Sequence, residues 1–220
     1  MNWDFDFLFN GQMIYFIQGA KWTLIISLAS VVLGVIFGTL LTFLKRSKIK
    51  VLNIISSAYI EIVRGTPLLL QIYIVYFGLT NIVNIGEIPA VIMALSLNSG
   101  AYVSELIRAG IEAVDKGQME AARSLGMTES MAMRIIIMPQ AIKNILPAIG
   151  NEFVAIIKES SMASTLGVAE LMYGAKVVST RSFNYTETLI MSAVFYFIMT
   201  FSLGRLIKFI ERRLKVSDSN

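Results

Sequence analysis

Three charged side chains stand inside long apolar stretches of the sequence, where an ionised group is costly. Glu61 and Arg64 lie three residues apart and would share one face of a helix. Two interpretations stay open for them: an ion pair that neutralises itself and holds its helix in register, or polar groups that line the path of a ligand. Glu152 has no basic neighbour in sequence, so it needs a cation from elsewhere in the protein or from a ligand.

Free backbone groups are expected next to Arg64. Gly65, Thr66 and Pro67 follow it, and a proline removes a backbone donor and clashes with the preceding turn, so we expect the helix to kink or break there. Free amides and carbonyls beside charged side chains suit a zwitterion. The candidate ligand-binding residues are Glu61, Arg64, Asn98, Tyr102, Glu152, Glu159 and Ser160.

A polar patch over residues 98–104 interrupts another apolar run, and in it Asn98 and Tyr102 lie four residues apart, on one helical face. A ligand contact is one interpretation of this patch. Close packing between helices is the other and the commoner one, because small residues at helical spacing let two backbones approach.

The composition of the whole chain places these residues in a membrane. Of 220 residues, 55% are hydrophobic and 15% are charged, and the mean hydropathy is +0.68. A soluble domain carries about 25% charged residues, so this chain lacks the polar surface to cover a water-facing globule, and disorder is excluded as well. With 4 prolines the chain can form long helices, and the sequence predicts an all-α integral membrane protein in contact with the lipid bilayer.

The residue types that are absent exclude several classes of chemistry. The chain has no Cys and no His, so it contains no disulfide, no thiolate nucleophile and no Ser-His-Asp triad. It also lacks the glycine-rich phosphate loop that ends in Gly-Lys-Ser/Thr. We therefore expect no metal site and no cofactor on this chain, and we expect it not to be an enzyme.

Five apolar runs approach the roughly 20 residues that a membrane-spanning helix needs. We predict spans over about 22–44, 51–79, 88–111, 135–157 and 189–210, all within a single transmembrane domain over residues 1–220. The stretch 158–188 is too long for a plain turn. We predict that it dips into the protein and then forms a short interfacial helix over 168–178.

The positions of Lys and Arg set the orientation of these spans. Basic residues crowd into 45–50, 112–134 and the C-terminal tail, which five spans place on one side. The other side carries only Lys21, Lys176 and Arg181. Because basic residues favour the cytoplasmic side, we predict an external N-terminus and a cytoplasmic C-terminus. The beginning of the chain lacks the basic stretch of a signal peptide, so the first span should be retained.

One predicted cytoplasmic segment, 113–134, and the start of the span after it contain a motif with defined spacing. It reads EAARSLGMTESMAMRIIIMP: Glu-Ala-Ala, three residues, Gly, nine residues, then Ile-x-Met-Pro. This resembles the EAA loop of ABC importer permeases, with Met138 where Leu is usual. The resemblance implies that the loop docks on a cytoplasmic ATPase through Glu120, Ala121, Ala122, Gly126 and Pro139.

Other segments narrow the resemblance. EIVRGTPLLLQ at 61–71, NSGAYVSELIRAGI at 98–111 and KESSMASTLGVAEL at 158–171 are similar to permeases for polar amino acids of the histidine/glutamine/arginine type. The resemblance implies a multi-pass protein of a bacterial or archaeal inner membrane. It also implies a second permease subunit, either a second copy or a close paralogue, two ATPase subunits that use ATP and Mg, and an extracytoplasmic solute-binding protein. Nucleic acid is not among the expected partners.

The physical character of the loop agrees with docking. Residues 117–130 are expected to form one short amphipathic helix, with Glu120 either contacting the ATPase or capping the helix. Gly126 would permit close approach to another backbone or end the helix. A surface helix that lies at the membrane interface is the simpler alternative.

The predicted function is import of polar, and more narrowly basic, amino acids by alternating access, driven by the partner ATPase. Arg64 and Ser160 suit the carboxylate of an amino acid, whereas Asn98 and the acidic residues suit its amine and side chain. Acidic groups outnumber Arg64, which favours arginine, lysine or histidine over glutamate. We expect Glu61 and Glu152 near mid-membrane.

Two other classes of protein would also contain intramembrane charges. A secondary transporter or channel is one, and the absence of an inverted repeat together with the docking motif argues against it. A membrane-embedded enzyme is the other, and the lack of His and Cys leaves it few catalytic groups.

Overall fold

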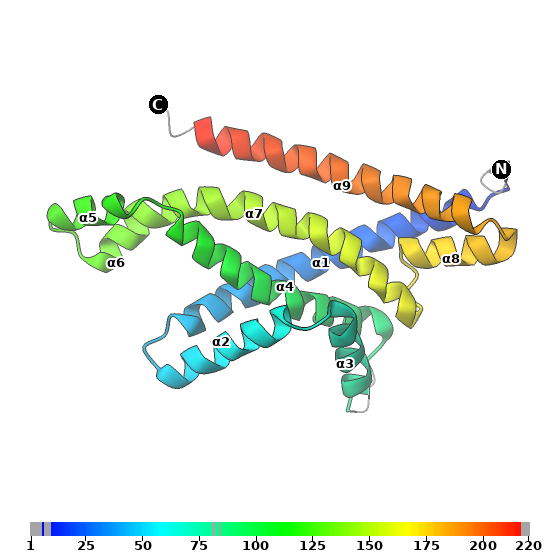
Figure 1. The fold of residues 1–220 in the computed structure, drawn as a ribbon, viewed down its shortest axis with the longest axis horizontal. Helices are drawn as coiled ribbons and strands as arrows, with labels where there is room; N and C mark the ends of the chain where they lie inside the picture. The colour runs from blue at the N-terminus through cyan, green and yellow to red at the C-terminus, as the bar shows by residue number, and fades with distance from the viewer. Residues whose placement is uncertain (1–5, 7–9, 81, 84, 217–220) are drawn as a thin grey trace.

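The computed structural model describes residues 6, 10–80, 82–83 and 85–216, and the regular elements in this part of the chain are all helices (Figure 1). The prediction of an all-α fold is therefore confirmed. In chain order the elements are α1 Met13–Lys45, α2 Lys50–Arg64, α3 Leu68–Thr80, α4 Glu87–Glu112, α5 Lys116–Ser124, α6 Glu129–Ala132, the π-helix η2 Met133–Ile137, α7 Met138–Glu159, the 3-10 helix η3 Ser160–Leu166, α8 Leu171–Ser182 and α9 Tyr185–Val216.

Four of the five predicted spans coincide with one long helix each: α1, α4, α7 and α9. Among the described helices, α1, α4 and α9 are long and apolar enough to cross a membrane, and α2 with α3 adds a fourth if this bent pair is one span. α7 does not belong to this group, and its sequence includes the charged residues Lys143, Glu152, Lys158 and Glu159. Length and composition thus support three or four crossings.

The predicted break at Pro67 is present, and a side chain from the next helix fills it. α2 ends at Arg64, α3 begins at Leu68, and the two helices are bent by 113°. The Gln71 amide nitrogen donates to the carbonyl oxygens of Val63 (2.7 Å) and Thr66 (3.1 Å). In a helix the Val63 carbonyl would accept from the N–H of residue 67, but Pro67 has none, so the Gln71 side chain supplies the missing donor. The predicted span 51–79 is therefore not a straight helix.

α4 lies at the centre of the fold, where it packs against α1, α2, α3 and α7. Its contact with α1 depends on glycine. A Cβ atom on Gly34 would lie 2.8 Å from the Cβ of Ser99, and one on Gly38 would lie 2.6 Å from the carbonyl oxygen of Gly100. Ser99 and Gly100 belong to the polar patch at 98–104, so this part of the patch serves close helix packing.

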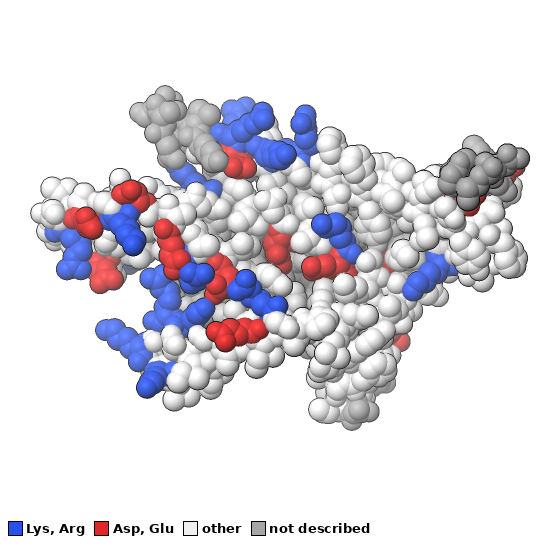
Figure 2. All heavy atoms as spheres, in the orientation of Figure 1, with Lys and Arg blue, Asp and Glu red and all other residues white. Residues whose placement is uncertain are grey.

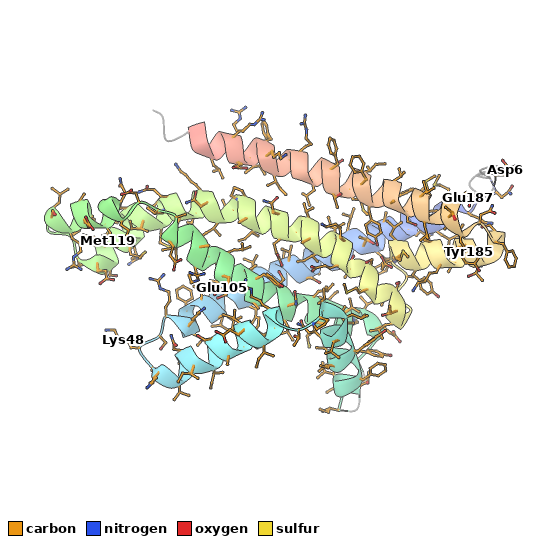
Figure 3. The ribbon with its side chains drawn as sticks, in the orientation of Figure 1. Asp6, Lys48, Glu105, Met119, Tyr185 and Glu187 are labelled. Atoms are coloured by element: carbon orange, nitrogen blue, oxygen red, sulfur yellow. The ribbon has the colours of Figure 1, made fainter. Side chains whose placement is uncertain are left out.

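Basic side chains gather at one end of the molecule, around the turn between α1 and α2 and over α5 and α6 (Figure 2). We call this the basic end. Lys48 and Met119 lie there, whereas Tyr185 and Glu187 lie at the opposite end (Figure 3). Both α1 and α9 run toward the basic end, and α8 lies at the other (Figure 1). α1 therefore begins at one end of the molecule and α9 ends at the other, as an odd number of membrane crossings requires.

A fully buried carboxylate, Glu170, holds the end opposite the basic end together. It caps α8 by accepting hydrogen bonds from the backbone N–H groups of Met172 (3.0 Å) and Tyr173 (2.9 Å). The hydroxyls of Tyr196 (2.9 Å) and Thr23 (3.4 Å) also donate to it. One carboxylate therefore joins α8 to both α1 and α9, and four donors depend on it.

We predict that Glu170→Ala lowers the free energy of unfolding by about 3 kcal/mol, because it leaves several buried donors without an acceptor. Tyr196→Phe removes one of these donors and should cost about 1 kcal/mol. The measurement is the thermal unfolding midpoint of the purified protein in detergent. Glu187→Ala, at the same end but outside this network, is the control. An equal shift for Glu170→Ala and Glu187→Ala would contradict the assignment.

Candidate functional site

The proposed Glu61–Arg64 ion pair is not formed. Arg64 turns toward α4: its guanidinium lies 5.4 Å from the ring centroid of Tyr102, and its Nη1 atom lies 3.7 Å from a carboxylate oxygen of Glu105. Glu61 is exposed. Three-residue spacing makes a local pair with Glu61 possible, but the carboxylate of Glu105 is more enclosed, with 15% of its side chain exposed, so water screens its attraction for Arg64 less.

Glu105 is the centre of an ion-pair network that joins α1, α2 and α4 (Figure 3). Lys45 Nζ lies 2.8 Å from it and Arg108 Nη2 lies 2.9 Å from it, while Arg108 also pairs with Glu112 at 2.5 Å. Since Arg64 reaches the same carboxylate, the end of α2 lies at the depth of Glu105. The expected position of Glu61 near mid-membrane stays a prediction.

Asn98 and Ser160 are committed to contacts within the protein. Asn98 is buried, and its amide nitrogen donates to Gln71 Oε1 at 2.9 Å, which ties α4 to the break between α2 and α3. Ser160 is fully buried, and its hydroxyl donates to the carbonyl of Ile157 at 2.9 Å. Gln71, which the sequence analysis did not single out, is thus the hydrogen-bond partner of Asn98.

Glu152 and Glu159 form a separate acidic pair on α7. They lie seven residues apart, about two helical turns, and so share one face of the helix. The hydroxyl of Ser99 in α4 lies beside Glu152. Both carboxylates are partly buried, and none of the ion pairs among the described residues includes either of them. This face of α7 therefore presents two carboxylates that have no ion-pair partner in the described part of the chain, next to Lys158.

Four of the seven candidate ligand-binding residues thus lie in pairs, Arg64 with Tyr102 and Glu152 with Glu159. The other three lie apart: Asn98 contacts Gln71, Ser160 bonds to Ile157, and Glu61 is exposed. None of the seven lines the cavity of about 690 Å³ between α1, α4, η2 and α7. A second cavity, of about 400 Å³, lies between α1, α2 and α4 beside Lys45 and Arg108, and none of the seven lines it.

The segment 113–134 forms two helices, α5 and α6, where the sequence predicted one over 117–130. Asp115 caps α5 by accepting from the N–H of Gly117 at 2.7 Å, and Thr128 caps α6 by accepting from the N–H of Met131 at 3.3 Å. Glu120 is therefore not the cap, and its exposed side chain remains available to a partner. Both Asp and Thr are preferred at helix N-termini.

Gly126 ends α5 in the left-handed conformation, with φ at +85°. Its N–H donates to the carbonyl of Arg123 (3.0 Å), and the N–H of Met127 donates to the carbonyl of Ala122 (3.2 Å). This pair of bonds is the Schellman motif, which favours glycine at this position. The turn presents Leu125, 85% exposed, at the tip of the α5–α6 hairpin. An exposed leucine beside a helix-ending glycine is a signal that the sequence analysis missed.

The residues of the EAA-like motif differ in how exposed they are. Glu120, Ala121, Gly126 and Pro139 are exposed, whereas Ala122 is only 5% exposed on the inner face of α5, the helix that packs against η2. η2 follows α6 directly and α7 follows η2 directly, so the hairpin is joined to α7 without a loop.

Residues 30–216 match the family described as the inner membrane component of binding-protein-dependent transport systems. The putative glutamine transport system permease protein of Rickettsia bellii (strain RML369-C) is 41% identical over 217 residues, which are 97% of this chain and 100% of the relative. The arginine transport system permease protein of Bacillus subtilis (strain 168) is 41% identical over 220 residues, covering 99% of this chain and 100% of the relative.

Two solved structures show the same fold. A crystal structure of an amino acid ABC transporter with histidines matches with a TM-score of 0.92 and 46% identity, over 97% of this chain and 100% of that one. The MetNI methionine ABC transporter in an inward-facing conformation matches with a TM-score of 0.68 over 90% of this chain and 97% of that one. At 19% identity, the second match concerns the fold alone.

Proposed function

Since the chain belongs to the family of inner membrane components of binding-protein-dependent transport systems, we propose that it carries basic amino acids, arginine, histidine or lysine, across the membrane. It is a permease subunit of an amino acid ABC importer, and it is not an enzyme, because ATP hydrolysis belongs to a separate subunit. The preference for basic substrates and the mechanism are our proposals.

The observation that carries the preference is the acidic face of α7. Glu152 and Glu159 have no ion pair among the described residues, while Arg64 is held by Glu105. A buried carboxylate without a partner is unfavourable, so the cationic side chain of a substrate would be stabilised there. Glutamine is the second candidate, because relatives at 41% identity are named for glutamine as well as for arginine.

The test is ATP-dependent uptake by the complete importer in proteoliposomes. Labelled arginine, lysine, histidine, glutamine and glutamate are compared at equal concentration, with the same ATPase and solute-binding protein throughout. We expect uptake of the three basic amino acids to exceed that of glutamine, and glutamate to be transported least. Uptake of glutamine above all three basic amino acids would contradict the proposed preference.

We propose that ATPase closure is transmitted through the α5–α6 hairpin. The hairpin would seat Gly126 and Leu125 in the ATPase dimer, with ATP and Mg bound by that partner. Because η2 joins the hairpin to α7 without a loop, movement of the hairpin would move the helix that bears Glu152. A second permease subunit and an extracytoplasmic solute-binding protein complete the assembly, and the site opens to one side of the membrane at a time.

We propose a multi-pass topology in a bacterial or archaeal inner membrane, with five crossings, an external N-terminus and a cytoplasmic C-terminus. Support comes from the basic end, which contains the α1–α2 turn and the α5–α6 hairpin (Figure 2). In this arrangement α2 and α3 form one broken crossing, and α7 crosses in spite of its charges because α1, α4 and α9 pack around it.

Cysteine labelling tests this topology without background, since the native chain contains no cysteine. We predict that Ser47→Cys, beside Lys48 at the basic end, is protected from a membrane-impermeant reagent in intact cells and reacts after permeabilisation. Thr186→Cys, beside Tyr185 at the opposite end, should react in intact cells (Figure 3). Reaction at Ser47→Cys combined with protection of Thr186→Cys would reverse the orientation.

A further inference from the structure

The largest of the cavities described above, about 690 Å³, is a groove with apolar walls. Phe43 of α1 forms one wall, Ile142 and Ile149 of α7 form the other, and Ile107 and Ile111 of α4 lie between them. Phe43 is 70% exposed and Ile142 is 44% exposed, so the groove is open along one side. Its chemistry suits a hydrocarbon chain, and a polar amino acid would gain little from these walls.

Two arginines mark the end of this groove. Arg46 comes directly after α1, and Arg134 lies in η2. Both are exposed, and neither takes part in an ion pair among the described residues. Glu129, which lines a neighbouring cavity together with Arg46, is paired with Arg123 at 3.9 Å. The groove therefore ends in two cations that have no ion-pair partner in the part of the chain that the structure describes.

The length of the groove agrees with one leaflet of a bilayer. Its lining residues on α7 extend from Met138 to Ile149, which corresponds to about 16 Å along the helix axis. Half of the hydrocarbon core of a bilayer is about 15 Å thick. Arg46 lies in the turn between α1 and α2, and Arg134 follows α6, so both belong to the basic end, which the topology proposed above places in the cytoplasm. In that orientation the apolar part of the groove spans the cytoplasmic leaflet, and the arginines lie at headgroup level.

We infer that this groove binds an anionic phospholipid of the cytoplasmic leaflet. One acyl chain lies between Phe43 and Ile142, and the phosphate of the headgroup lies between Arg46 and Arg134. A bound lipid then links the end of α1 to η2, the segment that connects the α5–α6 hairpin to α7. The inference does not depend on which amino acid is transported, and the binding measurement below does not require transport.

Native mass spectrometry of the purified, delipidated chain, titrated with phosphatidylglycerol or phosphatidylcholine, tests the inference. We expect one phosphatidylglycerol to bind more tightly than phosphatidylcholine. Arg46→Gln combined with Arg134→Gln should weaken phosphatidylglycerol binding roughly thirtyfold, since each basic residue near the headgroup contributes to the attraction. Lys48→Gln combined with Lys50→Gln removes the same charge from the same end, outside the groove, and should change binding less than about threefold.

The apolar wall is tested separately. Ile142→Trp fills the groove and should reduce binding, whereas Ile135→Trp, on an exposed position of η2 outside the lining, should not. Equal losses in the arginine and lysine double variants, or equal binding of the two lipids by the wild-type protein, would overturn the inference. So would a disulfide-linked dimer formed through Ile142→Cys in membranes, because a second copy would then cover the groove.

Discussion

Replacing Gly126 with aspartate is expected to abolish transport while the chain still folds and inserts into the membrane. Gly126 has φ at +85°, and a Cβ atom placed there would meet no other atom within 4 Å in the described part of the chain. Aspartate tolerates this left-handed conformation better than most residues. The substitution should therefore strain the hairpin by only about 1 kcal/mol, too little to prevent folding.

The loss of transport would then arise in the complex. If the turn at Gly126 enters a cleft of the ATPase, an added charged side chain stands between the two backbones, and the neighbouring Leu125 cannot be buried. Burial of a leucine side chain contributes about 2 kcal/mol, and a carboxylate forced into the same contact is unfavourable. Transport should fall at least about a hundredfold, the effect of some 3 kcal/mol.

The measurements are ATP-dependent uptake in proteoliposomes and recovery of the ATPase with the affinity-purified permease. Ser47→Asp is the matched control: it adds the same charge in another loop of the basic end, and aspartate can still accept the hydrogen bond that Ser47 accepts from the N–H of Ile49. We expect this control to transport normally. Normal uptake by an assembled Gly126→Asp importer would show that the hairpin is not the docking element.

Local sequence rules predicted the parts of the structure that depend on local chemistry. The break at Pro67 follows from a missing N–H. A helix end was one of the two roles expected for Gly126, and α5 does end there because a positive φ costs little at glycine. The same rules missed that the break is closed by Gln71, because a side chain that reaches back to Val63 cannot be recognised from hydropathy. They also merged α5 and α6 into one helix, although Thr128 is a good helix cap.

Interactions between distant segments could not be predicted. Arg64 has a carboxylate three residues away in Glu61, yet it pairs with Glu105, and only the packing of α2 against α4 decides between them. The hydrogen-bond network of Glu170 could not be predicted either, because its partner Thr23 lies 147 residues away in the sequence. The candidate ligand-binding residues were chosen by polarity within apolar runs, a criterion that selects packing residues such as Asn98 together with exposed ones.

Glu152→Gln is expected to separate basic from neutral substrates. Glu152 and Glu159 place two carboxylates on one face of α7, and the cationic side chain of a substrate would pair with them, whereas that of glutamine would not. Removing one partner of a buried charged contact typically costs about 2–5 kcal/mol. Uptake of arginine should therefore fall at least about thirtyfold in the variant, and uptake of glutamine should change less than about threefold.

Uptake of both amino acids is measured for Glu152→Gln and for Glu187→Gln, a carboxylate at the end opposite the basic end that is outside the proposed site (Figure 3). The control should leave both rates unchanged. Because glutamine is nearly isosteric with glutamate, the packing of α7 against α4 is preserved, and a difference between the two substrates must come from the charge. Equal losses for arginine and glutamine would make Glu152 a structural carboxylate, and full activity with both would remove it from the path of the substrate.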